Sequence, residues 1–232
     1  MARQFVSAVI VAAGNSTRMG MDKIFLPLNA VPAIVYTLNA FECAETIDEV
    51  ILVCKDDHVS ALREIIQNHN IKKVTNLTPG GSSRQESVFA GISLCDERAT
   101  HYAVHDAARC LITSAEIDSV VRDAFVHGAS SLGVPCKDTI KAVDSQNFVV
   151  KSLDRSVLWN IQTPQVFAKD LYSAAMNAAV RAGTDYTDDC QLIENISKRV
   201  HIVKGRYSNL KLTTPDDIAV FEEILRQRSD SL

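Results

Sequence analysis

Two cations lie close together in a short glycine-containing segment that follows the first apolar run of the chain. Residues 12–23 read Ala-Ala-Gly-Asn-Ser-Thr-Arg-Met-Gly-Met-Asp-Lys, and Asp22 is the one acidic residue near Arg18 and Lys23. Gly14 allows a ligand to approach the backbone closely, and successive backbone N–H groups in such a turn can surround an anion. The segment therefore predicts an anion-binding loop, and a triphosphate is the ligand we expect for it. A plain turn with a solvated arginine and lysine remains open at this point.

This loop differs from two familiar phosphate-binding motifs. It lacks the G-x-x-x-x-G-K-[ST] pattern of the P-loop, and Gly14 and Gly20 do not fit the G-x-G-x-x-G fingerprint of dinucleotide-binding domains. A dehydrogenase is therefore disfavoured.

The composition limits the classes of protein that the chain can belong to. Its 232 residues, 47% of them hydrophobic, are enough for one α/β domain over 1–232 with a sizeable core. A net charge of −4 predicts no general attraction to nucleic acid or to an anionic membrane. No apolar run approaches the roughly 20 residues of a membrane span, and the N-terminus offers no signal peptide. The six cysteines form no C-x-x-C pair and no zinc spacing, so we expect a reduced, cytoplasmic protein.

Strand and helix patterns alternate along most of the chain. Apolar, β-branched runs predict strands, and amphipathic runs predict helices, one of which is expected to begin with Ser114 as its N-cap. The alternation predicts an α/β fold with a three-layer, mostly parallel sheet. The expected strands lie at 5–12, 49–54, from 74, 101–106, 131–135 and 200–203, and the expected helices at 32–43, 57–68, 84–96, 114–127, 169–182, 188–195 and 215–226.

One stretch, at about 137–160, breaks this alternation. Two short apolar runs at 139–143 and 148–151 flank the turn Asp144-Ser-Gln-Asn147, which is typical of a β-hairpin. We therefore expect a β-arm that projects from the sheet.

Seven segments make the chain recognisable as a whole. It resembles the 2-C-methyl-D-erythritol 4-phosphate cytidylyltransferases of the non-mevalonate isoprenoid pathway, and the matching segments occur in the family's order over nearly the whole chain. They are AAGNSTRMGMDK (12–23), GGSSRQESVFAG (80–91), HDAAR (105–109), KDTIK (137–141), LDRSVLWNIQTPQVF (153–167), TDD (187–189) and NLKLTTPDD (209–217).

The resemblance implies a fold, an activity, a cofactor and an assembly. The implied fold is a nucleotide-diphospho-sugar transferase-like sheet with a β-arm. The implied reaction joins CTP to 2-C-methyl-D-erythritol 4-phosphate, a sugar-alcohol phosphate, and yields 4-diphosphocytidyl-2-C-methyl-D-erythritol and pyrophosphate. Mg²⁺ or another divalent cation and a homodimer formed through the arm are implied as well.

The chemistry of this reaction suits the residues. The second pKa of a phosphate monoester is about 6, so the nucleophile is already an anion at neutral pH and needs no catalytic base. The reaction requires charge neutralisation where negative charge builds at the α-phosphate. By resemblance, Arg18 and Lys23 stabilise that transition state.

Further residues are expected to bind CTP. By resemblance, Ala12, Ala13 and Gly14 contact the nucleotide, and Gly81, Ser82 and Ser87 contact the cytosine. Asp106 ends a strand, where a carboxylate can serve substrate hydroxyls or Mg²⁺; a helix N-cap or an ion pair with Arg109 is the alternative. Three positions depart from the family's usual residues, namely Ser82 (acidic), Cys110 (proline) and Ile24 (glutamine).

The acceptor phosphate is expected to meet a second group of residues. The resemblance assigns Arg109, Thr139, Arg155, Thr163 and Lys211 to it, with Arg155 and Lys211 also catalytic. The arm residues Thr139 and Arg155 would act in the neighbouring subunit's site. A hydroxyl, a guanidinium and an ammonium are suitable partners for a phosphate monoester. Without the resemblance, Arg155 is a surface arginine paired with Asp154.

The remaining acidic pairs have a plainer interpretation. Asp188-Asp189 and Asp216-Asp217 are expected to lie at helix starts, where carboxylates interact favourably with the helix macrodipole.

Two rival functions stay open. One is a cytidylyltransferase that acts on ribitol 5-phosphate, and the other is a module that binds CTP without catalysis.

Overall fold

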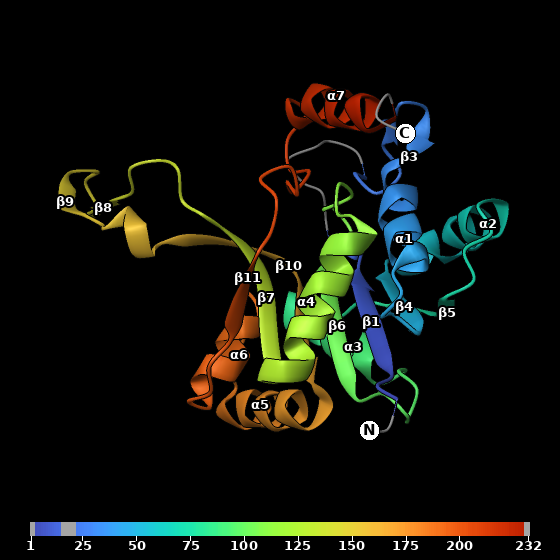
Figure 1. Ribbon diagram of the computed structural model, residues 1–232, viewed down its shortest axis with the longest axis horizontal. Coiled ribbons are helices and arrows are strands. Elements are labelled where there is room, and N and C mark those ends of the chain that lie inside the picture. Colours follow the sequence, from blue (N-terminus) through green and yellow to red (C-terminus); the bar gives the residue numbers. More distant parts are fainter. Residues whose placement is uncertain (1–2, 15–21, 230–232) are drawn as a thin grey trace.

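The computed structural model describes residues 3–14 and 22–229, so Arg18 lies outside the described residues. Within these ranges seven strands form one central sheet (Figure 1). Their order across the sheet is β11 (His201–Lys204), β7 (Ala129–Pro135), β10 (Trp159–Ala168), β6 (His101–Asp106), β1 (Val6–Val11), β4 (Glu49–Cys54) and β5 (Val74–Pro79).

The sheet is parallel except at one strand. β1 pairs in parallel with both β4 and β6, whereas β10 runs antiparallel between β6 and β7. The buried runs that form β1 and β4 are short and rich in valine and isoleucine, as is typical of strands covered on both faces, and β6 is buried along its whole length. The prediction of a mostly parallel sheet is confirmed.

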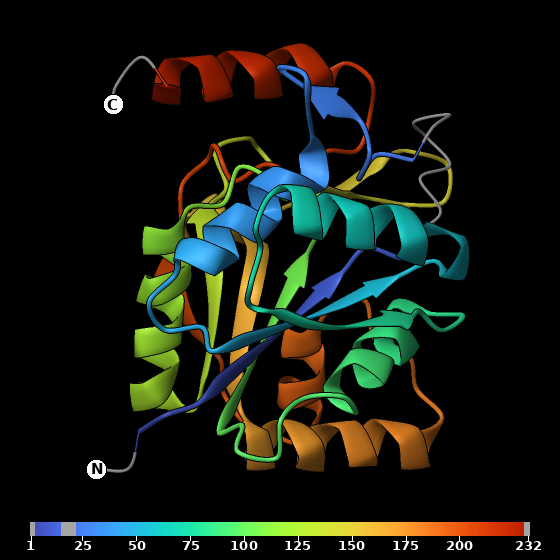
Figure 2. The same cartoon turned by 90° about the vertical axis from the view of Figure 1, so that its right-hand side faces the viewer.

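Helices cover both faces of this sheet, which gives the three predicted layers (Figure 2). One face carries α1 (Ala33–Cys43), α2 (Val59–Asn68) and α4 (Ser114–His127), and the short 3₁₀ turn η1 (Asp56–His58) leads directly into α2. The other carries α3 (Arg84–Ile92), α5 (Lys169–Ala182) and α6 (Asp189–Asn195).

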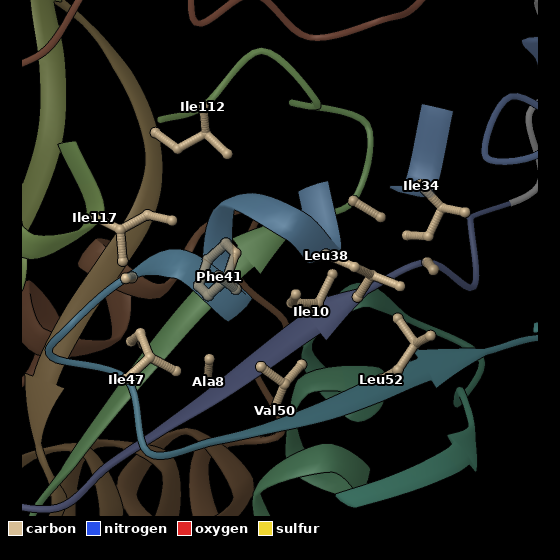
Figure 3. Packing of buried hydrophobic residues seen from close by; sticks show 14 of the residues in the cluster. Ala8, Ile10, Ile34, Leu38, Phe41, Ile47, Val50, Leu52, Ile112 and Ile117 are labelled. Atoms are coloured by element: carbon tan, nitrogen blue, oxygen red, sulfur yellow. The ribbon is translucent and has the colours of Figure 1, made fainter. Parts of the chain in front are cut away.

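The alternation of side chains along β1 divides the core between the two faces. Ala8 and Ile10 pack with Phe41 of α1 and Leu52 of β4 in the larger cluster (Figure 3), whereas Val9 points to the opposite side of the sheet. Successive side chains of a strand point to opposite faces, so one short run supplies both cores. These clusters hold the carboxyl ends of β1, β4 and β6 at one edge.

A third cluster lies beyond that edge. The last helix, α7 (Asp217–Ser229), packs against a small hairpin of β2 (Pro27–Leu28) and β3 (Val31–Pro32). Leu28, Phe221 and Leu212 are buried there together with Cys110, so the cysteine that replaces the family's proline is a core residue. All six cysteines are free.

The predicted arm projects far from the sheet (Figure 1). It contains the antiparallel strands β8 (Lys141–Val143) and β9 (Val149–Ser152), followed by the 3₁₀ turn η2 (Arg155–Val157). Both strands are exposed along their whole length.

Three local predictions need correction. β10 was not predicted as a strand. Thr113, not Ser114, is the N-cap of α4: it forms a reciprocal capping box with Glu116, which satisfies two backbone N–H groups. α3 ends at Ile92, four residues before the predicted end at Asp96. None of the helices in the described ranges has the length and apolar character needed to cross a bilayer.

Candidate active site

A cavity of about 360 Å³ lies at the carboxyl ends of β1 and β6. This is the edge at which open α/β sheets bind ligands. The cavity brings together nine of the residues predicted from the sequence, namely Ala12, Ala13, Gly14, Lys23, Gly81, Ser82, Ser87, Asp106 and Lys211.

The loop between β5 and α3 forms one wall and depends on its glycines. A Cβ atom on Gly80 would lie 2.5 Å from the Cβ of Ala13 and 2.8 Å from the hydroxyl of Ser87, and one on Gly81 would overlap the side chain of Glu86. Only glycine fits at these two positions, because a methyl group on Gly80 would separate the loop from the end of β1 and one on Gly81 would displace Glu86 of α3.

Hydrogen bonds fix this wall in place. The hydroxyl of Ser87 accepts from the N–H of Gly81 at 3.1 Å and donates to the carbonyl of Ser83 at 2.8 Å. The carboxylate of Glu86 accepts from the backbone N–H of Ser82 at 2.7 Å and from its hydroxyl at 2.6 Å. Glu86 thus places a carboxylate beside the position where the family usually has an acidic residue.

Asp106 forms ion pairs with two cations that line the cavity. Its Oδ2 accepts from Nζ of Lys211 at 2.7 Å, and its Oδ1 lies 3.5 Å from Nε of Arg84. Burial raises the pKa of Asp106, but the charges of Lys211 and Arg84 outweigh burial and hold the pKa well below its usual range. The carboxylate is therefore ionised and orients both cations. The alternative of an ion pair with Arg109 is wrong.

Arg84 connects Asp106 to a second buried carboxylate. Its Nη1 donates to Asp189 at 2.7 Å, and the hydroxyl of Tyr172 donates to the other oxygen of Asp189 at 2.6 Å. Asp189 is 1% exposed, so our interpretation of it as a helix-start charge is incomplete: it is a buried partner of Arg84. Burial lowers the pKa of Arg84, but Asp189 and Asp106 outweigh it and raise the pKa overall.

Arg84 is the main residue that the sequence analysis missed. It lies in the first turn of α3, where a cation opposes the helix macrodipole. An arginine at that unfavourable position is a signal that a carboxylate partner lies elsewhere in the chain.

Lys23 lines the cavity close to a further ion pair. Nζ of Lys55 lies 2.8 Å from Oδ2 of Asp22, and Nε2 of His58 lies 3.5 Å from the same oxygen. Asp22, the one acidic residue of the predicted loop, therefore forms an ion pair with Lys55. Ile24 also lines the cavity and is buried in the core, where the family's glutamine would need a polar partner.

Thr163 supports Asp106 from behind and does not line the cavity. Its hydroxyl accepts from the backbone N–H of Asp106 at 3.1 Å and pairs with Nδ1 of His105 at 2.9 Å. Burial lowers the pKa of His105 to about 3, so its imidazole is neutral. Thr163 therefore positions the carboxylate in this structure.

The other predicted acceptor ligands lie apart from the cavity within one chain. Arg109 donates to the backbone carbonyls of Asn209 at 2.9 Å and Ile161 at 3.4 Å. Thr139 and Arg155 are exposed on the arm, and Nη1 of Arg155 donates to the carbonyl of Lys137 at 3.0 Å, not to Asp154. Lys211 is the one member of the predicted acceptor group that lines the cavity.

A divalent cation would find a single carboxylate, that of Asp106, among the described residues that line the cavity. Mg²⁺ is usually held by one or two carboxylates together with substrate phosphates and water. The residues present fit an ion that arrives with the triphosphate and takes Asp106 as a ligand in competition with Lys211 and Arg84.

Known proteins resemble this chain over nearly its whole length. Residues 6–227 match the family profile described as 2-C-methyl-D-erythritol 4-phosphate cytidylyltransferase. A protein of that name from Caldanaerobacter subterraneus subsp. tengcongensis is 41% identical, over 96% of this chain and 99% of the relative. A chloroplastic one from Oryza sativa subsp. japonica is 39% identical, over 96% of this chain and 75% of the relative.

Solved structures agree with this assignment. The crystal structure of 4-diphosphocytidyl-2C-methyl-D-erythritol synthase from Anaerococcus prevotii superposes with a TM-score of 0.85 at 28% identity, over 96% of both chains. That of the cytidylyltransferase from Thermus thermophilus gives a TM-score of 0.78 at 26% identity, over 96% of this chain and 100% of the other. The chain therefore belongs to the 2-C-methyl-D-erythritol 4-phosphate cytidylyltransferase family.

Proposed function

We propose that the protein transfers CMP from CTP to 2-C-methyl-D-erythritol 4-phosphate in isoprenoid precursor biosynthesis. The observation that carries this proposal is the cavity at the sheet edge, where Arg84 and Lys211 pair with the ionised Asp106 and Lys23 lines the same cavity beside the Gly80-Gly81 wall. Family membership supplies the two substrates.

The reaction needs cations more than it needs a base. A phosphate oxygen of the acceptor attacks the α-phosphorus of CTP, a new P–O bond forms, and the bond to pyrophosphate breaks as pyrophosphate leaves. The attacking monoester is already ionised at neutral pH. Lys23 and Arg18 would neutralise the charge that develops on the triphosphate, and Lys211, aimed by Asp106, would draw in the acceptor phosphate.

The wall between β5 and α3 would read the base. Backbone groups of Gly81 and Ser82 are held in place by hydrogen bonds to Ser87 and Glu86 of α3, and Gly80 lets this loop approach Ala13 at the end of β1. A wall so close to the sheet suits a pyrimidine better than a larger purine. Mg²⁺ belongs to the same proposal: when bound with CTP, it would shield the charge of the triphosphate, with Asp106 as the protein ligand.

A homodimer joined through the arm completes the proposal. The arm exposes a set of apolar side chains that a single chain leaves in water, namely Val143, Phe148, Val149 and Val150. Exposed apolar patches of this kind mark interaction surfaces. A second copy that covers them would bring Thr139 and Arg155 toward a neighbouring cavity. A single-domain chain in the cytoplasm is part of the same proposal, supported by six free cysteines.

Pyrophosphate release tests the proposal. Purified protein is incubated with CTP and Mg²⁺ together with either 2-C-methyl-D-erythritol 4-phosphate or ribitol 5-phosphate. We expect pyrophosphate only with the first acceptor, in an amount equal to the CMP transferred. Turnover with ribitol 5-phosphate alone would assign the rival acceptor. CTP binding without pyrophosphate from either acceptor would identify a binding module.

A further inference from the structure

A second cluster of charged and metal-binding side chains lies on the face of α4, away from the cavity. Asp123 and His127 are one turn apart on α4, and His201 begins the edge strand β11. Each offers one donor atom, and the three atoms all lie within 4.8 Å of one another. We propose that Asp123, His127 and His201 bind a late first-row divalent cation such as Zn²⁺.

The geometry of the carboxylate points to a shared ligand. Its Oδ2 lies 2.8 Å from Nδ1 of His201, and its Oδ1 lies 3.8 Å from Nε2 of His127. Zn²⁺ bonds of about 2.0–2.1 Å in a tetrahedral site place neighbouring donor atoms about 3.3 Å apart. The observed separations, each to a different oxygen of Asp123, lie on either side of that value, and the side chains would rotate to seat the ion.

The two imidazoles are already arranged side by side. The rings of His127 and His201 stack with centroids 4.1 Å apart and an angle of 22° between their planes. Two protonated rings would repel each other at this distance, whereas two neutral rings can coordinate one ion. Imidazole and carboxylate together suit Zn²⁺, Ni²⁺ and Cu²⁺ more than Mg²⁺ or Ca²⁺.

A further hydrogen bond holds the carboxylate. The hydroxyl of Ser130, on β7, donates to Oδ2 of Asp123 at 2.5 Å. Ligating carboxylates are characteristically fixed by such outer partners. The site is also open to solvent, because the side chains of His127 and His201 are 44% and 49% exposed, which leaves room for a water as the fourth ligand.

An ion at this site would connect α4 to β11, a strand that one short ladder holds in the sheet. β11 is the edge strand and pairs only with β7 among the described strands, over His201 to Lys204. A bond from α4 to His201 would fasten the start of β11 to the helix. The chain that follows β11 leads to Lys211, which lines the cavity. The ion would therefore have a structural role, because it would hold in place the strand that precedes this segment.

Calorimetric titration with ZnCl₂ tests the proposal. The full-length protein, freed of any affinity tag, is treated with a chelator, dialysed, and titrated in a phosphine reductant at about pH 7.5, where imidazole is neutral. We expect one equivalent per chain with a Kd on the order of 10 µM or tighter. Zn²⁺ at about 100 times that Kd should raise the melting temperature by on the order of 5 °C.

Variants locate the binding. Outer partners of a metal ligand are worth about 10- to 100-fold in affinity, so loss of a direct ligand in His127→Ala or His201→Ala should weaken binding by about 100-fold or more. His69→Ala is the matched control, because His69 is exposed at the end of α2. Both cluster histidines are exposed enough to be replaced without loss of the fold, and circular dichroism checks this.

Two results would overturn the proposal. One is the absence of saturable Zn²⁺ binding by the wild-type chain, which would leave the cluster as a surface ion pair. The other is stoichiometric binding that both histidine variants retain, which would place the ion elsewhere, for example on the exposed Cys43.

Discussion

Asp106 shows how a single carboxylate can organise a site whose chemistry depends on cations. Its ion pairs with Lys211 and Arg84 keep it charged and leave those two side chains at defined positions beside Lys23. Cations that are fixed before the substrates arrive lose little energy to reorganisation when charge develops in the transition state. The proposed transfer therefore depends on how firmly each of these side chains is held.

Lys23 offers the most direct test of this view. Lys23→Ala should lower kcat/KM for pyrophosphate release by about 100-fold or more, as expected when one charged contact to a developing negative charge is lost. Lys72→Ala is the matched control, because Lys72 is an exposed lysine outside the cavity, and it should keep wild-type activity. If both variants retain full activity, Lys23 does not contact the reacting phosphates.

His105 predicts how stability depends on pH. Its folded pKa is about 3, whereas an unfolded histidine titrates near 6.5. Between these values the unfolded chain binds a proton that the folded chain does not, so the free energy of unfolding rises with pH and falls on acidification. One such group contributes a slope of at most about 1.4 kcal/mol per pH unit.

Replacement of the imidazole should remove this contribution. The free energy of unfolding of His105→Gln, measured by urea denaturation at pH 4, 5 and 6, should change less steeply with pH than that of the wild type. His101 is also buried with a lowered pKa, so part of the slope remains. His69→Gln, an exposed control, should retain the wild-type slope. Equal slopes for His105→Gln and the wild type would contradict a neutral, buried His105.

At the scale of elements, one buried ion pair fastens α3 to α6. Arg84 begins α3, Asp189 begins α6, and Tyr172 of α5 completes the contact with its hydroxyl. Removal of one partner of a buried pair leaves an uncompensated charge, which costs far more than removal of the charge on both sides. The pair therefore fixes how α3 and α6 are placed, and it adds little to the net free energy of unfolding.

A double-mutant cycle measures this coupling. Arg84→Met should lower the free energy of unfolding by about 3–5 kcal/mol, because Asp189 is left charged and buried. Arg84→Met combined with Asp189→Asn should recover a large part of that loss, since asparagine is neutral and can still accept from Tyr172. Urea denaturation of the wild type, Arg84→Met, Asp189→Asn and the double variant completes the cycle, and Arg63→Met on α2 serves as an exposed control. Additive losses would show that the two side chains are not coupled.

Elements with one strong local pattern were predictable from the sequence, and β10 was not. β4 and α5 have the predicted bounds because an unbroken apolar run and a helical period each point to one structure. β10 buries Gln162, Thr163 and Gln165 and contains Pro164, features that argue against a central strand. The register shift between Ile161 and Gln165 explains how the sheet tolerates the proline, because the ladder is interrupted there.

The same distinction holds for the site. Lys23, Gly81 and Asp106 belong to segments that match the family's motifs, so the resemblance singled them out, and all three line the cavity. The role of Arg84 depends on Asp189, 105 residues away: its place in the first turn of α3 signals a carboxylate partner, but no local pattern identifies which residue that partner is. Long-range ion pairs are set by the fold and can be recognised only once the fold is known.

At the scale of the whole molecule, the arm is the feature that a single chain leaves unexplained. Phe148 is 69% exposed and Val150 is 67% exposed on strands that contact no other part of the sheet. Thr139 and Arg155 lie on the same projection and not at the cavity. A two-fold dimer, the commonest symmetric assembly, would resolve both observations if each arm reached the partner's cavity.

Mixed dimers distinguish this arrangement from one in which Arg155 serves its own chain. Lys23→Ala and Arg155→Ala homodimers should each have little activity. If Arg155 acts across the dimer, a mixed dimer contains one intact cavity, which has Lys23 from one chain and Arg155 from the other. Random exchange of equal amounts should then restore about a quarter of the wild-type rate of pyrophosphate release. Native mass spectrometry of chains with different tags verifies the exchange, and mixing wild-type enzyme with the doubly substituted chain controls for dilution. If exchange occurs and no activity returns, Arg155 acts within its own chain and the arm serves assembly alone.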